Sequence, residues 1–167
     1  NTIKANWKNV TKTTLSTTIS NKFNLKVSTI EHLMSAIAAL QIDNLEIEIS
    51  GPEAPILDGS SKIYLKKLLD IGVVSQNENK QFIKILKKIT FKNDKAKASL
   101  YPSNNNFNIT YKINYNHPII KKEKYSLNIN KNSYKNEIAA ARTFGFINEY
   151  EKLKKAGLAK GASLDNC

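Results

Sequence analysis

The residues of this 167-residue chain best suited to chemistry are the neighbours Glu31 and His32. A neutral imidazole can ligate zinc, and an adjacent carboxylate can take a proton from a zinc-bound water. Consecutive helical residues point about 100° apart, so one side chain can face a metal while the other faces the water. The alternative is that Ser28 and Glu31 form a capping box, with His32 on the helix surface. Taken alone, the pair is a much weaker signal than HExxH, and the capping box is the better explanation.

The other candidates for chemistry are few. His117 precedes Pro118 in a turn, where we expect it to satisfy loop carbonyls. Residues 157–161 (GLAKG) are too short and irregular for a phosphate-binding loop, and no GxSxG elbow is present. The segment TFGF at residues 143–146 follows the only arginine, and its two aromatic rings could line an apolar groove or pack in the core.

Hydrophobic periodicity predicts the elements that must position these residues. Helical spacing predicts helices over residues 31–40, from 63 to near Gly72, over 133–140 and over 144–156, with Gly157 as a C-cap. Alternation and β-branched residues predict strands over 11–20, 45–49, 82–91, 96–101, 107–115 and 125–129. We expect the strands at 82–91, 96–101 and 107–115 to form a three-strand meander. Turns are expected at 21–24 and 103–106, a rigid loop at 51–60, and a linker at 73–80.

The charge of the chain is a weak guide to function. It has 26 basic and 14 acidic residues, a formal net charge of +12, but 25 of the basic residues are Lys. Arginine is the residue suited to bidentate contact with phosphate and guanine. Lys, Asn and Ile are in joint excess, which is typical of an A+T-rich genome, so we expect no nucleic acid as a partner. Attraction to an anionic substrate or membrane surface stays compatible with the charge.

Composition also limits the classes of protein. A single Cys excludes an internal disulfide framework and a cysteine-built zinc cluster, and no apolar run approaches the ~20 residues that span a bilayer. The only Met is Met34, so Asn1 is not a natural start. We therefore expect the sequence to be the interior of a longer protein.

Several segments together are far more specific than any one alone. They are STIEHLMSAIAAL (28–40), IDN (42–44), PEAPILDGS (52–60), NHP (116–118), ARTFGF (141–146) and GLAKGASLDN (157–166). In this order they resemble the UDP-3-O-acyl-N-acetylglucosamine deacetylases, which are cytoplasmic zinc amide hydrolases of lipid A biosynthesis in Gram-negative bacteria. The resemblance spans nearly the whole chain.

The resemblance implies an α+β fold of two similar two-layer α/β sandwich domains, like domain 2 of ribosomal protein S5. Residues 1–78 would be the first domain, truncated at its N-terminus and carrying the Glu-His motif. Residues 79–167 would be the second domain, truncated at its C-terminus.

The resemblance also implies roles for single residues. His32 would be a zinc ligand, Glu31 the general base, and Thr143 a hydrogen-bond donor to the tetrahedral intermediate. The remaining implied residues bind substrate: Leu15 and Ser16 before the first helix, Phe144, Phe146 and Tyr150 around the acyl chain, and Ala159, Ala162 and Ser163 in the same wall. The partner would be the UDP-linked acylated glucosamine, with a monomeric protein and at most peripheral membrane association.

The chain departs from the family in one large respect. The family's HKxxDxxGD motif, which supplies a His and an Asp to Zn²⁺, does not occur in the sequence. We expect these ligands downstream of Cys167, and we expect the 167 residues alone to bind zinc poorly and to be inactive. The alternative function is a non-catalytic basic α+β module that binds RNA or anionic lipid through its lysines.

Overall fold

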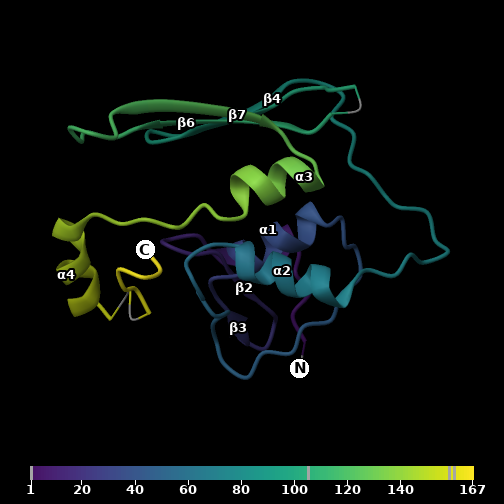
Figure 1. Cartoon of the computed structure of the whole chain (residues 1–167), viewed down its shortest axis with the longest axis horizontal. Helices are drawn as coiled ribbons and strands as arrows, with labels where there is room; N and C mark the ends of the chain where they lie inside the picture. The colour runs from purple at the N-terminus through teal and green to yellow at the C-terminus, as the bar shows by residue number, and fades with distance from the viewer. Residues whose placement is uncertain (1, 105, 158, 160) are drawn as a thin grey trace. The chain divides into compact units, whose positions relative to one another are not determined.

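The computed structural model describes residues 2–104, 106–157, 159 and 161–167 (Figure 1). It contains helices and small antiparallel sheets, in agreement with the predicted mixing of α and β elements. Contacts divide the chain into unit 1, Asn1–Val74 with Tyr134–Cys167, and unit 2, Ser75–Ser133. This grouping differs from the predicted domains, 1–78 and 79–167, in its C-terminal segment. The domain division of the whole protein stays a prediction.

Unit 1 begins with a short 3-10 turn, η1 (Trp7–Asn9), and a small sheet. Strands β1 (Val10–Lys12), β2 (Thr18–Ser20) and β3 (Lys26–Val27) pair antiparallel in the order β1-β2-β3. The prediction of one strand over 11–20 is wrong, because the chain bends between β1 and β2. Leu15 in this bend has a φ of 64°, a left-handed conformation that a continuous strand does not contain. The predicted turn at 21–24 is confirmed, and Asn21 Oδ1 accepts the Phe23 N–H at 2.9 Å.

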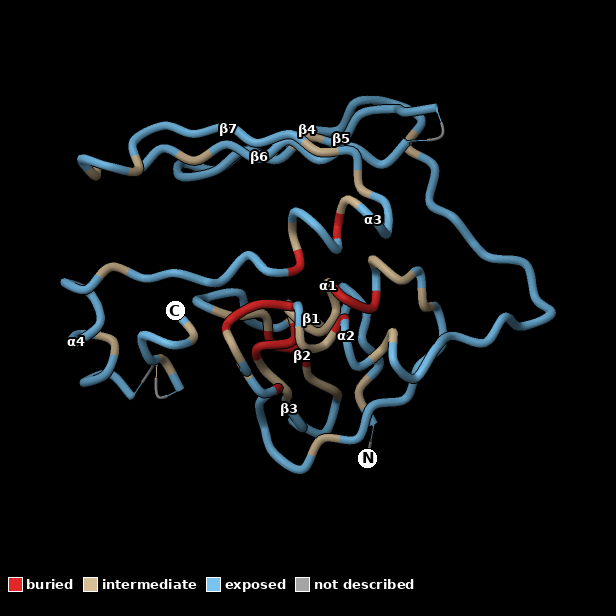
Figure 2. Tube along the Cα trace, in the orientation of Figure 1, coloured by how far each residue is buried: buried red, intermediate tan, exposed pale blue. Residues whose placement is uncertain are grey.

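Two helices form the centre of unit 1, as predicted. They are α1 (Glu31–Ala39) and α2 (Lys62–Ile71), and α2 ends at Gly72, whose φ is 87°. Their buried faces meet: Ala36 of α1 and Leu65 of α2 share one core cluster with Tyr134 and Ala139. Figure 2 shows the buried residues gathered around β2, α1 and α2. Apolar area removed from water stabilises this packing by about 25 cal/mol per Å².

The predicted strand over 45–49 is wrong, since these residues are described without strand pairing. Leu45 and Ile47 are 49% and 42% exposed. The alternation of apolar and polar residues predicts which face of a sheet each side chain would occupy. A strand also needs a neighbouring strand to pair with, and no local pattern specifies that neighbour. The loop that follows is ordered by a parallel bridge between Ser28 and Glu53. In it, the Ser28 N–H donates to Pro52 O and the Ala54 N–H to Ser28 O, both at 3.0 Å.

Unit 2 is built from two antiparallel ribbons. Strands β4 (Ile89–Lys92) and β5 (Lys97–Leu100) form one, and β6 (Asn108–Asn114) and β7 (Lys122–Asn128) form the other. The predicted three-strand meander is therefore wrong, because in the part of the chain that the structure describes β5 pairs only with β4 and β6 only with β7. The predicted strands at 96–101, 107–115 and 125–129 correspond to β5, β6 and β7, but the strand predicted over 82–91 is wrong over most of its length, because β4 begins only at Ile89.

The helical segments after β7 begin at the end of unit 2 and continue in unit 1. A short helix, α3 (Lys131–Ser133), runs into a π-helical turn, η2 (Tyr134–Ile138), which together match the predicted helix over 133–140. Helix α4 (Ile147–Lys155) begins three residues later than predicted, because Phe146 is extended, with φ −92° and ψ 133°. Gly157 follows its end with a φ of 74°. Across the described residues, every helix is too short or too polar to cross a bilayer.

Candidate functional site

Glu31 begins α1, and its carboxylate is turned towards the bend between β1 and β2. Its Oε2 accepts the Thr17 N–H at 2.9 Å. The predicted capping box is wrong, since no side chain caps α1. Its hydroxyl partner is already engaged, because Ser28 Oγ donates to Pro52 O at 3.3 Å. The carboxylate is thus bonded to the bend before β2 and not to its own helix, and its oxygens can accept further hydrogen bonds.

A small hollow of about 260 Å³ opens beside this carboxylate. Most of its wall is apolar, with Thr17, Asn6 and Glu31 as the polar members. A carboxylate that faces a largely apolar hollow can act as a base on a water or substrate held there. The apolar lining residues are Ala5, Trp7, Val10, Ile19, Ile30 and Met34.

The first group of predicted site residues lies close to Glu31. Leu15, 65% exposed, and the half-buried Ser16 occupy the bend that leads into Thr17. His32 follows Glu31 on α1 and is half-buried. The resemblance implied only that Leu15 and Ser16 face the substrate, and the hydrogen bond from Thr17 to Glu31 shows how their bend is held against α1.

The residues present do not make a complete zinc site. Within the described part of the chain, no three His, Cys, Asp or Glu side chains come together as a metal-holding group. Catalytic zinc needs about three protein ligands, and this neighbourhood offers the imidazole of His32 and the carboxylate of Glu31.

Thr143 is held by the loop that precedes α2. Its N–H donates to Gly59 O at 2.8 Å. The loop is stiffened by Asp58, whose Oδ1 accepts from the Ser60 N–H at 3.2 Å and from Ser60 Oγ at 2.8 Å. Burial alone would raise the pKa of Asp58, but the Ser60 hydrogen bonds and the Arg142 guanidinium outweigh it and lower that pKa below its ordinary value.

Gly59 is required in this loop for two reasons. Its φ is 78°, which disfavours any residue with a Cβ, and the carbonyl of Asn166 occupies the space that a Cβ would fill. The same glycine thus joins the segment of Thr143 to the C-terminal segment. The sequence pattern gave no role to Gly59, because its partners lie 84 and 107 residues further along.

The other predicted substrate-binding residues lie in these two segments. The rings of Phe144 and Phe146 meet edge to face, with centroids 5.9 Å apart, and Tyr150 lies on α4 under the ammonium of Lys154. In the C-terminal segment the Ala162 N–H donates to Ala159 O at 3.1 Å, and the Ser163 N–H donates to Asn166 Oδ1 at 2.8 Å. None of these residues lines the hollow beside Glu31. The described contacts thus form two clusters, one around Glu31 and one at Gly59, where the segment of Thr143 meets the C-terminal segment.

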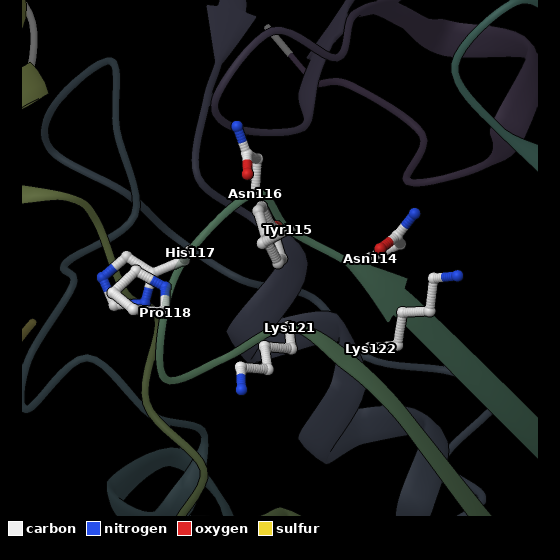
Figure 3. A pocket seen from close by; sticks show the side chains of 7 residues that line it. All are labelled: Asn114, Tyr115, Asn116, His117, Pro118, Lys121 and Lys122. Atoms are coloured by element: carbon white, nitrogen blue, oxygen red, sulfur yellow. The ribbon is translucent and has the colours of Figure 1, made fainter.

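A second, more open hollow lies in unit 2, where β6 ends and β7 begins (Figure 3). It has a volume of about 720 Å³ and is lined by Asn114, Tyr115, Asn116, His117, Pro118, Lys121 and Lys122. His117 orders this turn as an acceptor: its Nδ1 receives the N–H groups of Ile119 and Ile120 at 3.3 and 3.4 Å. The expected structural role of His117 is thus supported, although its printed partners are N–H groups instead of carbonyls.

Comparison with known proteins gives a consistent answer. A model of the family described as UDP-3-O-acyl N-acetylglycosamine deacetylase matches residues 1–167. Relatives named UDP-3-O-acyl-N-acetylglucosamine deacetylase include that of Teredinibacter turnerae, 44% identical over 166 residues, which covers 98% of this chain and 54% of the relative. The relative from Bdellovibrio bacteriovorus is 42% identical over 165 residues (99% and 54%), and that from Helicobacter hepaticus is 44% identical over 159 residues (95% and 52%). The chain spans about half the length of the curated relatives that it matches.

Proposed function

Because the chain belongs to the UDP-3-O-acyl N-acetylglycosamine deacetylase family, we propose that its whole protein hydrolyses the N-acetyl group of UDP-3-O-(3-hydroxyacyl)-N-acetylglucosamine. The products would be acetate and the free amine, in the committed step of lipid A biosynthesis. The observation that carries this proposal is the family match over all 167 residues, with relatives at 40–44% identity along nearly the full chain.

Glu31 would be the general base of this hydrolysis. The oxygen of a water adds to the acetyl carbonyl carbon while the Glu31 carboxylate takes the proton of that water. The carbon–nitrogen bond then breaks, and the leaving amine takes a proton from an acid. The hydrogen bond from the Thr17 N–H and the adjoining hollow support this role, since they fix the carboxylate beside a space for substrate.

Thr143 would hold the oxyanion that forms when the carbonyl is attacked. Its backbone N–H is donated to Gly59, so the hydroxyl is the group that would donate to the developing charge. The stiff loop of residues 58–60 favours such a role, because an oxyanion donor must be in position before the reaction.

The two aromatic rings of Phe144 and Phe146, together with Tyr150, would bind the fatty acyl chain. Phe144 is 54% exposed and Tyr150 37% exposed, so apolar surface is available to a ligand. The segment with Ala159, Ala162 and Ser163 would complete this wall, and Leu15 and Ser16 would contact substrate on the side of Glu31. We further propose that the whole protein is a cytoplasmic monomer built from two α/β sandwich domains.

His32 would be one ligand of a catalytic Zn²⁺, with the other ligands supplied by parts of the whole protein that this sequence does not include. When bound, zinc would make the attacking water more acidic. The chain offers a matched test, because it has two histidines and His117 orders a turn in unit 2.

In the whole protein, His32→Ala should lower the zinc content measured by atomic absorption to a small fraction of one per chain. His117→Ala should leave the zinc content unchanged. Equal zinc in the wild type and in His32→Ala would contradict the assignment of this ligand. Acetate release from the acylated substrate by the purified wild type tests the reaction itself, and its absence in zinc-loaded protein would refute the proposed function.

A further inference from the structure

Three hydroxyl groups from distant parts of the sequence meet inside unit 1. The Tyr134 hydroxyl lies 2.6 Å from Ser35 Oγ and 2.6 Å from Ser61 Oγ. Tyr134 is 4% exposed and Ser61 is 5% exposed, so these two groups are removed from water, whereas Ser35 is half-buried. We call Ser35, Tyr134 and Ser61 the hydroxyl chain.

Counting the protons of the three hydroxyls shows which group donates and which accepts in each hydrogen bond of the hydroxyl chain. Ser61 Oγ donates to the Ala139 carbonyl at 3.2 Å, which uses its only proton. Ser61 must then accept from Tyr134, and Tyr134 must accept from Ser35. Each hydroxyl thus donates once, and the loss of any member leaves a neighbour without its partner, at a cost for buried groups.

The π-helical turn η2 is what brings Tyr134 into this position. The Ala139 N–H donates to Tyr134 O at 2.8 Å, the i to i+5 pattern of a π turn. Tyr134 and Ala139 consequently both belong to the core cluster with Ala36 and Leu65. Such turns are rare, and they occur frequently at functional sites.

The two ends of the hydroxyl chain lie on the elements that carry the two clusters of the site. Ser35 is on α1, one helical turn after Glu31. Ser61 directly precedes α2 and lies two residues after Gly59, whose carbonyl holds the Thr143 N–H at 2.8 Å. Tyr134 therefore connects the helix of Glu31 to the loop that holds Thr143.

We propose that Tyr134 is a positioning residue: through Ser35 and Ser61 it fixes helix α1, with Glu31, relative to the 58–60 loop that holds Thr143. The catalytic consequence of this arrangement rests on the function proposed above. The structural consequence does not, because it concerns the two hydrogen bonds at Thr17 and Thr143.

Amide hydrogen exchange in the whole protein tests the structural consequence, with Tyr134→Phe compared with Tyr111→Phe, an exposed tyrosine of unit 2. We expect the Thr17 and Thr143 amides of Tyr134→Phe to exchange about tenfold faster, as locally loosened hydrogen bonds do, while the amides inside α2 keep their wild-type rates. Tyr111→Phe should leave both amides unchanged. Equal acceleration of all unit 1 amides would show general destabilisation and overturn the proposal, as would no change.

If Tyr134→Phe does not fold, Ser35→Ala replaces it, since this variant removes one end of the hydroxyl chain and keeps the buried ring. The expected result is the same selective acceleration at Thr17, with a smaller one at Thr143. Unchanged exchange at Thr17 in Ser35→Ala would equally overturn the proposal.

Steady-state kinetics of the same variants test the catalytic consequence. Tyr134→Phe should lower kcat roughly tenfold with KM unchanged, less than the ~100-fold that a 1 Å misplacement can cause. The Ser35→Ala/Tyr134→Phe double variant should be no slower than the worse single variant, because the hydroxyls act as one unit. Additive losses, or a change in KM alone, would contradict positioning. If the wild-type whole protein releases no acetate, the proposed function fails, and the exchange rates still decide the role of Tyr134.

Discussion

Units 1 and 2 both contain antiparallel strands, but only one of them is organised around buried side chains. In unit 1 a core cluster joins α1, α2 and η2, and three buried or half-buried hydroxyls bond inside it. In unit 2 none of the described residues, 75–104 and 106–133, is buried. Strand pairing therefore needs only a neighbouring strand, whereas a core needs a second layer of elements. The predicted catalytic residues lie in unit 1, where contacts from distant parts of the chain hold them in place.

The largest expected difference between the units concerns one leucine in each. Leu65 is 3% exposed at the centre of unit 1, and Leu100 is 54% exposed in β5. Leu65→Ala should lower the free energy of unfolding by about 2–5 kcal/mol, because it removes buried methyl groups and leaves a cavity. Leu100→Ala should lower it by less than about 1 kcal/mol. Urea unfolding measures both, and equal losses would show that the units do not differ in this way.

Three glycines of unit 1 differ in backbone conformation and in the space around them. Gly59 has a positive φ and the Asn166 carbonyl against it, Gly72 has a positive φ and open space, and Gly145 has open space alone. Gly72→Ala should cost about 1–3 kcal/mol of stability, because a φ of 87° with a ψ of 173° is essentially confined to glycine, and Gly145→Ala nearly nothing. Gly59→Ala should cost clearly more than Gly72→Ala, since the Asn166 carbonyl must also move.

Thermal unfolding of the three glycine variants gives the order directly. A loss for Gly59→Ala no greater than that for Gly72→Ala would mean that the contact with Asn166 carries no stability. The conclusion that Gly59 joins the 58–60 loop to the C-terminal segment in a stabilising way would then be wrong.

A smaller effect is expected from pH at the same loop. The pKa of Asp58 is lowered by the Ser60 hydrogen bonds and Arg142, which together outweigh burial, so its charged form is favoured in the folded state. The stability from this group is present above the unfolded value of 3.8 and is lost as pH falls through the folded pKa. Asp58→Asn should therefore destabilise the protein at pH 6 and have less effect near pH 3.

Ser60→Ala should also destabilise the protein more at pH 6 than near pH 3. Its effect should be smaller than that of Asp58→Asn, because it removes one hydrogen bond to the carboxylate. The free energies of unfolding of both variants, measured at pH 6 and at pH 3, test this expectation. A cost of Asp58→Asn that is independent of pH would contradict an ionic role for this carboxylate.

Much of the local structure could be predicted from the sequence, because it depends on neighbours along the chain. Helices α1 and α2 follow from their apolar stripes, and Gly72 ends α2 where its φ becomes positive. The turn at Asn21 follows from its side-chain acceptor. The failures involve long-range choices: the segment 45–49 alternates but is not described as a strand, and 11–20 is divided by a bend at Leu15.

The site shows the same limit. Glu31 and His32 were predicted as site residues from their adjacency and the family resemblance, but the spacing to Ser28 predicted the wrong partner, since Ser28 bonds to Pro52 and Glu31 to Thr17. Tyr134 was missed because its hydroxyl partners lie 99 and 73 residues away. Neither relation leaves a periodic signal in a single sequence.

The most direct test of the account is the rate of acetate release by whole protein that carries Glu31→Gln. Glu46→Gln is the matched control, because Glu46 is an exposed glutamate in unit 1. If Glu31 is the base, Glu31→Gln should lower kcat by about 100- to 10,000-fold, while zinc content and the Glu46→Gln rate stay at wild-type values. A Glu31→Gln rate within a few fold of the wild type, or a loss of zinc in that variant, would contradict the central claim.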